Sequence, residues 1–117
     1  MTLLLTLLVA CDTSPAIDEV AAECVPEGHF DDLFVFEAWT SGEVDDVSLR
    51  MVLQGEEWSL LPLAEEDTDY WTGEMWGSTA NADCRELEGI TYRFIATGAD
   101  GTEATVDLDA ETGETAE

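Results

Sequence analysis

Apolar and polar residues alternate along much of this 117-residue chain, which indicates short β-strands. The clearest alternation lies at 47–53, where every second side chain is apolar and the residues between them are mostly polar. Other stretches are rich in aromatic and β-branched residues and end at glycine, proline or acidic clusters, which is typical of strands. The predicted strands are 33–39, 47–53, 58–63, 70–76, 90–96 and 102–108.

One face of each strand is predicted to be buried, because side chains two positions apart point to the same side of a sheet. The residues expected to face the core are Phe34, Phe36, Ala38, Val47, Leu49, Met51, Leu53, Ile90, Tyr92, Phe94, Ala96, Ala104, Val106 and Leu108. Turns or loops are predicted between the strands, including a polar loop at 65–69 and a long loop at 78–88. The Asp-Gly pair at 100–101 favours a tight hairpin.

The segments outside the strands are predicted to be a tether and a tail. Residues 11–28 are small and acidic and contain two prolines, as expected of a spacer. Ser14 followed by Pro15 is a favourable helix start, so one short helix is predicted within the spacer. The apolar residues at helical spacing there are Ile17, Val20, Ala21 and Cys24. The domain itself is predicted to cover 29–109, and the tail 110–117, which lacks large apolar residues, is expected to be disordered.

Many short strands with frequent turns and no long helix favour an antiparallel β-sandwich of about six or seven strands. The segment 92–101 resembles the last hairpin of immunoglobulin-like and fibronectin type III-like domains of bacterial surface proteins, and the resemblance extends loosely over residues 30 to 108. Those domains often carry a cysteine pair within two facing strands. Here Cys84 falls in a predicted loop and Cys24 in the predicted spacer, so the resemblance implies an architecture and no function.

The first dozen residues form a short apolar run, which ends at Cys11 and is followed by Asp12. The run is too short to span a bilayer, which takes about 20 apolar residues, but it fits a secretory signal. Leu8-Val9-Ala10-Cys11 resembles the lipobox of bacterial lipoproteins, which implies cleavage after residue 10 and a lipid on Cys11. The expected location is the cell envelope, on a membrane and facing the periplasm or the exterior. A buried first strand at 3–10 is the alternative.

The cysteine count agrees with lipidation of Cys11. Three cysteines would leave one unpaired in an exported protein. If Cys11 carries a lipid, Cys24 and Cys84 remain as a natural disulfide pair, which closes a loop of about 60 residues and contributes about 4 kcal/mol in the chain-entropy model. Two buried free thiols are the alternative, although disulfides are common outside the cytoplasm.

The charge of the chain restricts its partners. There are 28 acidic residues against three arginines and no lysine, which gives a net charge of −25. Nucleic acids are bound through Lys and Arg contacts to phosphate, so nucleic-acid binding is excluded. The domain is equally unsuited to lie on an anionic lipid surface. The acids are spread along the chain, as on a solvated surface, and such a surface favours a soluble monomer.

The residues that commonly carry catalysis are nearly absent. His29 is the only histidine, and nothing near it in the sequence completes a catalytic triad. Lysine chemistry is impossible, and neither a zinc motif nor a phosphate-binding glycine loop is present. Asp107, Asp109 and Glu111 have a spacing that suits calcium, but Gly113 is misplaced for an EF-hand loop. We therefore expect a protein that is not an enzyme and that holds no metal or cofactor.

Aromatic residues of the 70–76 strand are the remaining candidates for a binding site. Trp71 and Trp76 are five positions apart and must face opposite sides of the sheet, whereas Tyr70 shares the side of Trp76. At most one of these faces is the core, so an exposed aromatic platform is predicted unless loops cover it. Two functions follow: a binding or structural module for an unknown envelope protein, or a carbohydrate-binding module that uses Trp71 or Trp76.

Overall fold

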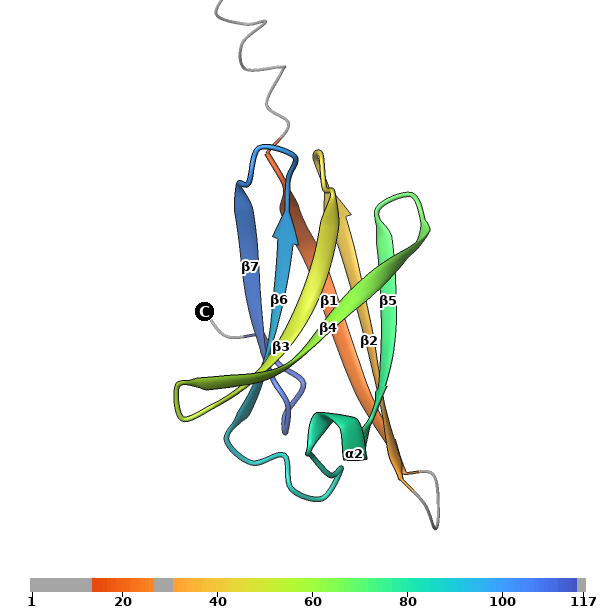
Figure 1. Ribbon diagram of the computed structural model, residues 1–117, viewed down its shortest axis with the longest axis vertical. Helices are drawn as coiled ribbons and strands as arrows, with labels where there is room; N and C mark the ends of the chain where they lie inside the picture. The colour runs from red at the N-terminus through yellow and green to blue at the C-terminus, as the bar shows by residue number, and fades with distance from the viewer. Residues whose placement is uncertain (1–13, 27–30, 116–117) are drawn as a thin grey trace, which may run out of the picture.

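The computed structural model describes residues 14–26 and 31–115, and within these residues it contains one antiparallel sheet of seven strands (Figure 1). Cys11 and His29 lie outside the described residues. The strand order in the sheet is β1-β2-β5-β4-β3-β6-β7. The elements are β1 (Ala16–Pro26), β2 (Asp32–Ser41), β3 (Asp46–Leu53), β4 (Glu56–Asp67), β5 (Tyr70–Trp76), a one-turn helix α2 (Gly77–Ala80), β6 (Ile90–Thr97) and β7 (Glu103–Asp109).

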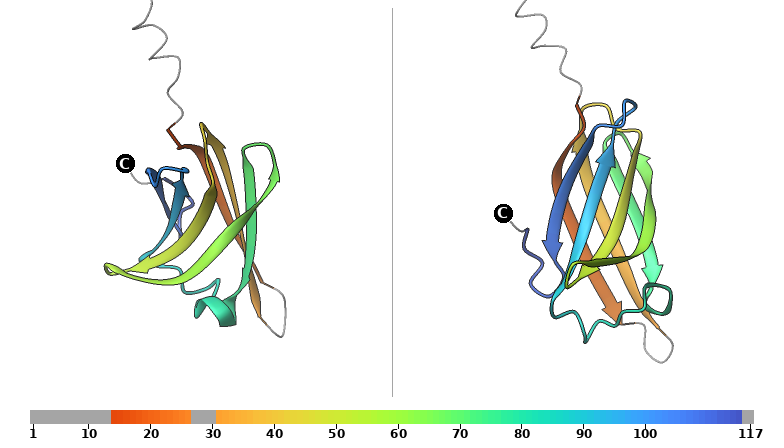
Figure 2. Two further views of the ribbon diagram at one scale, coloured as in Figure 1. Left: turned by 45° about the horizontal axis from the view of Figure 1, so that its top comes forward. Right: turned by 60° about the vertical axis from the view of Figure 1, so that its left-hand side comes forward.

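Strand β4 connects two halves of the sheet. Its residues 56–63 pair with β3, whereas residues 64–67 pair with β5. In the right-hand view of Figure 2, the half that contains β3, β6 and β7 lies in front of the half that contains β1, β2 and β5. The prediction of an antiparallel all-β fold with about six or seven strands is therefore confirmed. The seven strands form one continuous sheet, because β4 is hydrogen-bonded to both halves.

The core lies between these two halves and is built around aromatic rings. Phe36 of β2 is fully buried, and its ring centroid lies 5.0 Å from that of Tyr92 and 6.2 Å from that of Phe94, both on β6. Burial raises the pKa of Tyr92 to about 12. Edge-to-face contacts of this kind add to the free energy gained by removing apolar surface from water. The two halves of the sheet are thus joined by packing as well as by β4.

The alternation pattern placed most strands correctly. Strand β5 has the predicted bounds, and β2, β3, β6 and β7 differ from their predicted bounds by one or two residues. Leu53 was expected in the core, but it is 37% exposed, because it is the last residue of β3 and lies beside the turn into β4. Strand β4 was predicted too short and 65–69 was expected to be a loop; residues 65–67 instead extend β4, because they gain β5 as a partner.

The predicted helix near the N-terminus is wrong. Ala16–Pro26 is strand β1, which pairs antiparallel with β2 from Ala16 opposite Ser41 to Pro26 opposite Asp32. Most of the predicted tether 11–28 is therefore part of the sheet. The pairing satisfies the backbone groups of this segment that face β2, and Val20 joins the core.

The expected disorder after residue 109 is also wrong as far as residue 115. The carboxylate of Asp109 accepts hydrogen bonds from the backbone amides of Glu111 and Thr112, at 2.9 and 3.0 Å, which closes a turn. The chain then returns, so that Thr115 bridges Leu108 of β7. An aspartate that bonds the backbone a few residues on is a strong turn signal, and this segment covers part of the β7 edge.

Two of the three arginines form ion pairs with acidic residues on one outer face of the sheet. Arg50 and Arg93 lie directly opposite each other on β3 and β6, and Glu57 bridges them with bonds of 2.9 Å to each. Arg93 also binds Asp107 of β7 at 2.9 Å. The hydrogen bond from Arg50, with that from Arg93, holds the pKa of Glu57 below its usual value. The third arginine, Arg85, lies in the loop between α2 and β6 and pairs with Asp83.

Candidate binding surface at the far end

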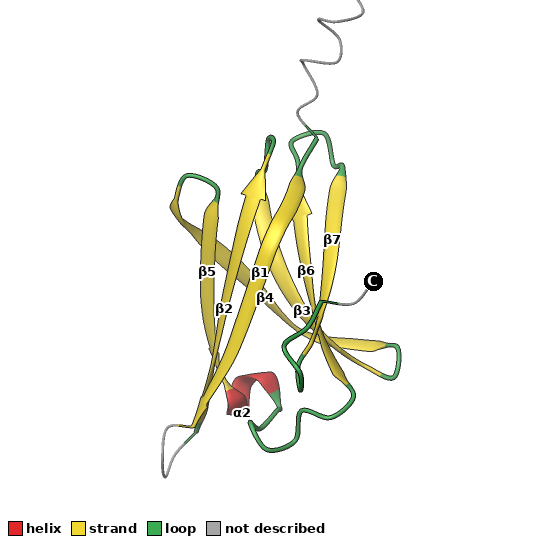
Figure 3. Cartoon of the chain, turned by 180° about the vertical axis from the view of Figure 1, so that it is seen from behind, coloured by secondary structure: helices red, strands yellow, loops and turns green. Residues whose placement is uncertain are grey.

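The two ends of the domain differ in construction. Strand β1 begins at one end, beside the loops 42–45, 68–69 and 98–101; we call this the tether end (Figure 1). The opposite end carries α2, the loop 81–89 and the β3–β4 turn at 54–55, and we call it the far end (Figure 3). The far end holds two of the three large apolar side chains that are exposed among the described residues, Leu53 and Trp76.

A bulge in β4 fixes α2 against the far end. The pairing of β4 with β3 shifts register between Leu49 and Met51, and Ser59 adopts a positive φ of 58° at this point. A bulge redirects side chains; here Leu60 turns outward and is 64% exposed. The Trp58 indole N–H and the Ser59 hydroxyl, which is 3.0 Å away, both donate to the carbonyl oxygen of Ala80. The last residue of α2 is thus bound by β4.

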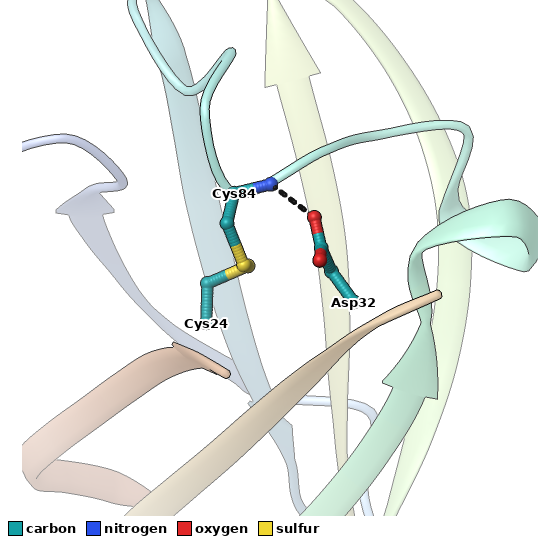
Figure 4. A group of neighbouring side chains, drawn as sticks. All are labelled: Cys24, Asp32 and Cys84. Atoms are coloured by element: carbon teal, nitrogen blue, oxygen red, sulfur yellow. Dashed lines mark hydrogen bonds between the residues drawn. A yellow bond between two sulfur atoms is a disulfide. The ribbon is translucent and has the colours of Figure 1, made fainter. Parts of the chain in front are cut away.

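Two adjacent aspartates hold the other side of this end. Asp31 accepts hydrogen bonds from the backbone amide of Ser78, at 2.9 Å, and from its hydroxyl. Asp32 accepts a bond of 2.8 Å from the backbone amide of Cys84 (Figure 4). The sequence did not single out either aspartate, because an acidic residue before a strand has many uses and its partners lie about fifty positions away.

The predicted disulfide between Cys24 and Cys84 is present, with a Cα–Cα distance of 5.5 Å (Figure 4). It joins β1 to the loop 81–89. Among the described residues, Cys24, Cys84 and Asp32 also form the only group of three acidic, histidine or cysteine ligand atoms within 4.8 Å of one another. Metal ions bind thiolates, and sulfur atoms joined in a disulfide are not thiolates. The group is therefore a structural disulfide with a neighbouring carboxylate and not a metal centre.

A groove of about 310 Å³ lies between the β3–β4 turn and the first part of the loop 81–89, residues 81–86. Its apolar wall consists of Leu53, Trp58, Ala82 and Ile90. Its polar lining consists of Gln54, Glu56, Asn81, Asp83 and Glu86. A second hollow of about 350 Å³ lies next to it and shares residues 81–83 and Glu86, but its lining is mostly polar. At the far end, apolar and acidic groups therefore meet in a concave site.

The carboxylates around the groove are not equivalent. Asp83 accepts bonds from the backbone amide of Arg85, at 2.8 Å, and from its guanidinium at 3.5 Å, and the amide bond holds the pKa of Asp83 below its usual value. Within residues 14–26 and 31–115, by contrast, no side chain or amide is found to donate to the carboxylates of Glu56 and Glu86. These two charges are therefore available to a ligand.

The predicted aromatic platform is only partly retained. Trp71 is 5% exposed, and its indole N–H donates to the Thr40 hydroxyl at 3.0 Å, so it cannot seat a ligand. Trp76 is 47% exposed at the far end. Tyr70 lies at the other end of β5, where it packs on Trp39 and donates to Glu37. Tyr70 and Trp76 are about 20 Å apart along the strand and do not form one surface.

Comparison of the chain with protein-family models, with curated proteins and with solved structures gives no match. Among residues 14–26 and 31–115, no helix has the length and hydropathy needed to cross a bilayer.

Proposed function

We propose that this protein is a non-catalytic, lipid-anchored component of the bacterial cell envelope, which presents the far end of its acidic β-domain to a partner. The observation that carries the proposal is the position of β1. Its first residue, Ala16, follows Cys11 by five positions and lies at the opposite end of the domain from α2 and the groove. A lipid on Cys11 would therefore leave the groove directed away from the membrane.

The connection between Cys11 and β1 is short, so a lipid on Cys11 would hold the domain in this orientation. Five residues span at most about 18 Å when fully extended, so a membrane anchor at Cys11 keeps the tether end close to the lipid. Strand β1 pairs along its whole length with β2, and the disulfide fixes its distal part to the loop 81–89. The domain would thus be held by one of its own strands, and not by a long spacer as its composition suggested.

The charge distribution supports the same arrangement. A net charge of −25 disfavours contact with anionic headgroups, so the domain gains nothing by lying flat on the membrane. The far end, which combines the exposed side chains of Leu53 and Trp76 with a groove, remains accessible. Concave sites with an apolar wall and a few polar groups are typical binding sites.

In-cell photocross-linking tests the proposed binding surface. Full-length chains would carry a benzoyl-phenylalanine at position 53, 76 or 99; Leu53 and Trp76 lie at the far end, and Ala99 in the exposed hairpin at the tether end is the matched control. We expect a discrete adduct from positions 53 and 76 and none of the same mass from position 99. Equal adducts from all three positions, or an adduct from position 99 alone, would refute a binding surface at the far end.

A carbohydrate ligand is the second candidate, and the exposed indole of Trp76 is the observation that favours it, because aromatic faces stack on sugars. The same experiment separates the two candidates. An adduct at position 76 that resists protease and contains sugar supports the carbohydrate ligand, whereas an adduct that protease removes supports a protein partner.

A further inference from the structure

The far-end groove combines an apolar wall with two carboxylates that no described residue is found to engage. We propose that it binds an arginine side chain on an exposed segment of a partner protein. This inference rests on the proposed function, since it specifies the partner of the same binding surface.

The size of the groove suits one long side chain. Sites for small molecules usually have volumes of about 300 to 1,000 Å³, and this groove, at about 310 Å³, lies at the lower limit. Leu53, Trp58 and Ile90 give it an apolar wall. Long basic side chains pack their methylene groups on apolar surface while the charged end reaches polar groups. An arginine would place its stem on this wall.

The charge of the groove suits a cation. Glu56 begins β4 and Glu86 belongs to the loop 81–86, so one free carboxylate comes from each of two segments that line the groove. The nearest basic residue in the sequence, Arg85, is bound to Asp83, and its side chain is 89% exposed. Charge-assisted hydrogen bonds to carboxylates are among the stronger polar contacts in proteins. The surrounding charge of −25 would also accelerate the encounter with a basic partner.

A guanidinium fits this arrangement better than a metal ion or an ammonium. The carboxylates of Glu56, Asp83 and Glu86 do not belong to any group of three ligand atoms within 4.8 Å in the described residues, so they do not converge on a single ion. A guanidinium is planar, presents five donors and can bridge separated acceptors. It also stacks on aromatic rings, and Trp58 lines the groove.

Peptide titration tests the inference. The probe is the acetylated, amidated pentapeptide Ala-Leu-Arg-Leu-Ala, titrated into the isotopically labelled full chain in detergent micelles and followed by NMR. We expect shifts of the amides of Gln54, Asn81 and Ala82 and none in the hairpin 98–101. The same peptide with citrulline, which has the shape but not the charge, should bind about tenfold more weakly. Equal binding of both peptides would overturn the inference.

Matched charge variants exclude a general attraction to the polyanion. The double variant Glu56→Gln/Glu86→Gln and the control Glu43→Gln/Glu103→Gln remove the same charge, and the control residues are exposed at the tether end. At 0.15 M salt, where the screening length is about 8 Å, we expect about tenfold weaker binding for the first and less than about twofold for the control. Equal losses would contradict a specific site.

The outcomes also separate this inference from the proposed function. If the arginine peptide shows no preference but positions 53 and 76 still cross-link, the far end binds a partner and the inference about arginine is wrong. If the cross-links are absent as well, the proposed binding surface is wrong.

Discussion

Replacement of both Cys24 and Cys84 by alanine is expected to lower the free energy of unfolding by about 4 kcal/mol, because the bond closes a loop of 60 residues in the unfolded chain. For a domain of this size, that loss lowers the melting temperature by roughly 15 to 30 °C. The native state loses little besides the bond, since the amide of Cys84 is held separately by Asp32. Thermal unfolding followed by circular dichroism measures the effect.

The reduced wild-type protein provides the control for this experiment. Addition of a reductant should bring the wild type to the melting temperature of the double variant and leave the variant unchanged. A variant that melts within a few degrees of the oxidised wild type would show that the loop closure contributes little, and that packing alone holds β1 and the loop 81–89 together.

Phe36→Ala is expected to cost about 3 to 5 kcal/mol, the range observed when a buried phenylalanine is truncated. The ring is fully buried, and its centroid lies 5.0 to 6.4 Å from those of Tyr92, Phe94 and Phe34. Because β2 and β6 belong to different halves of the sheet, the cavity would open where the halves meet and could not collapse easily. Equilibrium unfolding in urea measures the loss.

Leu60→Ala is the matched control, because Leu60 is also a large apolar residue of a strand but is 64% exposed. We expect a change within about 0.5 kcal/mol for this variant. If the two variants lose the same stability, Phe36 does not have the central position in the core that its ring contacts indicate.

The sequence predicted those strands that have a regular alternation and one buried face. Every second residue from Phe34 to Ala38 in β2 and from Ile90 to Ala96 in β6 is aromatic or aliphatic, so the strand period and the buried face could be read from the sequence. Strand β1 was missed for a physical reason. Its pairing with β2 shifts register between Ile17 and Glu19, so the apolar residues Ile17 and Val20 are three positions apart and imitate a helical repeat. The regular alternation resumes only from Val20 through Ala22 to Cys24.

The candidate site was less accessible to prediction. The spacing of Trp71 and Trp76 showed that they lie on opposite faces, but it could not show which face is buried, since that depends on the core residues that pack around Trp71. The groove is lined by Leu53 at the end of β3 and by residues of the loop 81–89. The helix α2 is held in place by the hydrogen bond from the Trp58 indole to the Ala80 carbonyl oxygen. These are tertiary contacts between residues more than twenty positions apart, and no local pattern encodes them.

The central claim is that a lipid on Cys11 holds the tether end of the domain at a membrane, and metabolic labelling with radioactive palmitate tests it most directly. The full chain and its Cys11→Ala variant would be expressed in a bacterial host and isolated under non-reducing conditions. We predict label in the wild type and none in the variant, because the other two cysteines are joined in the disulfide. An unlabelled wild type, or label that persists in the variant, would contradict the account.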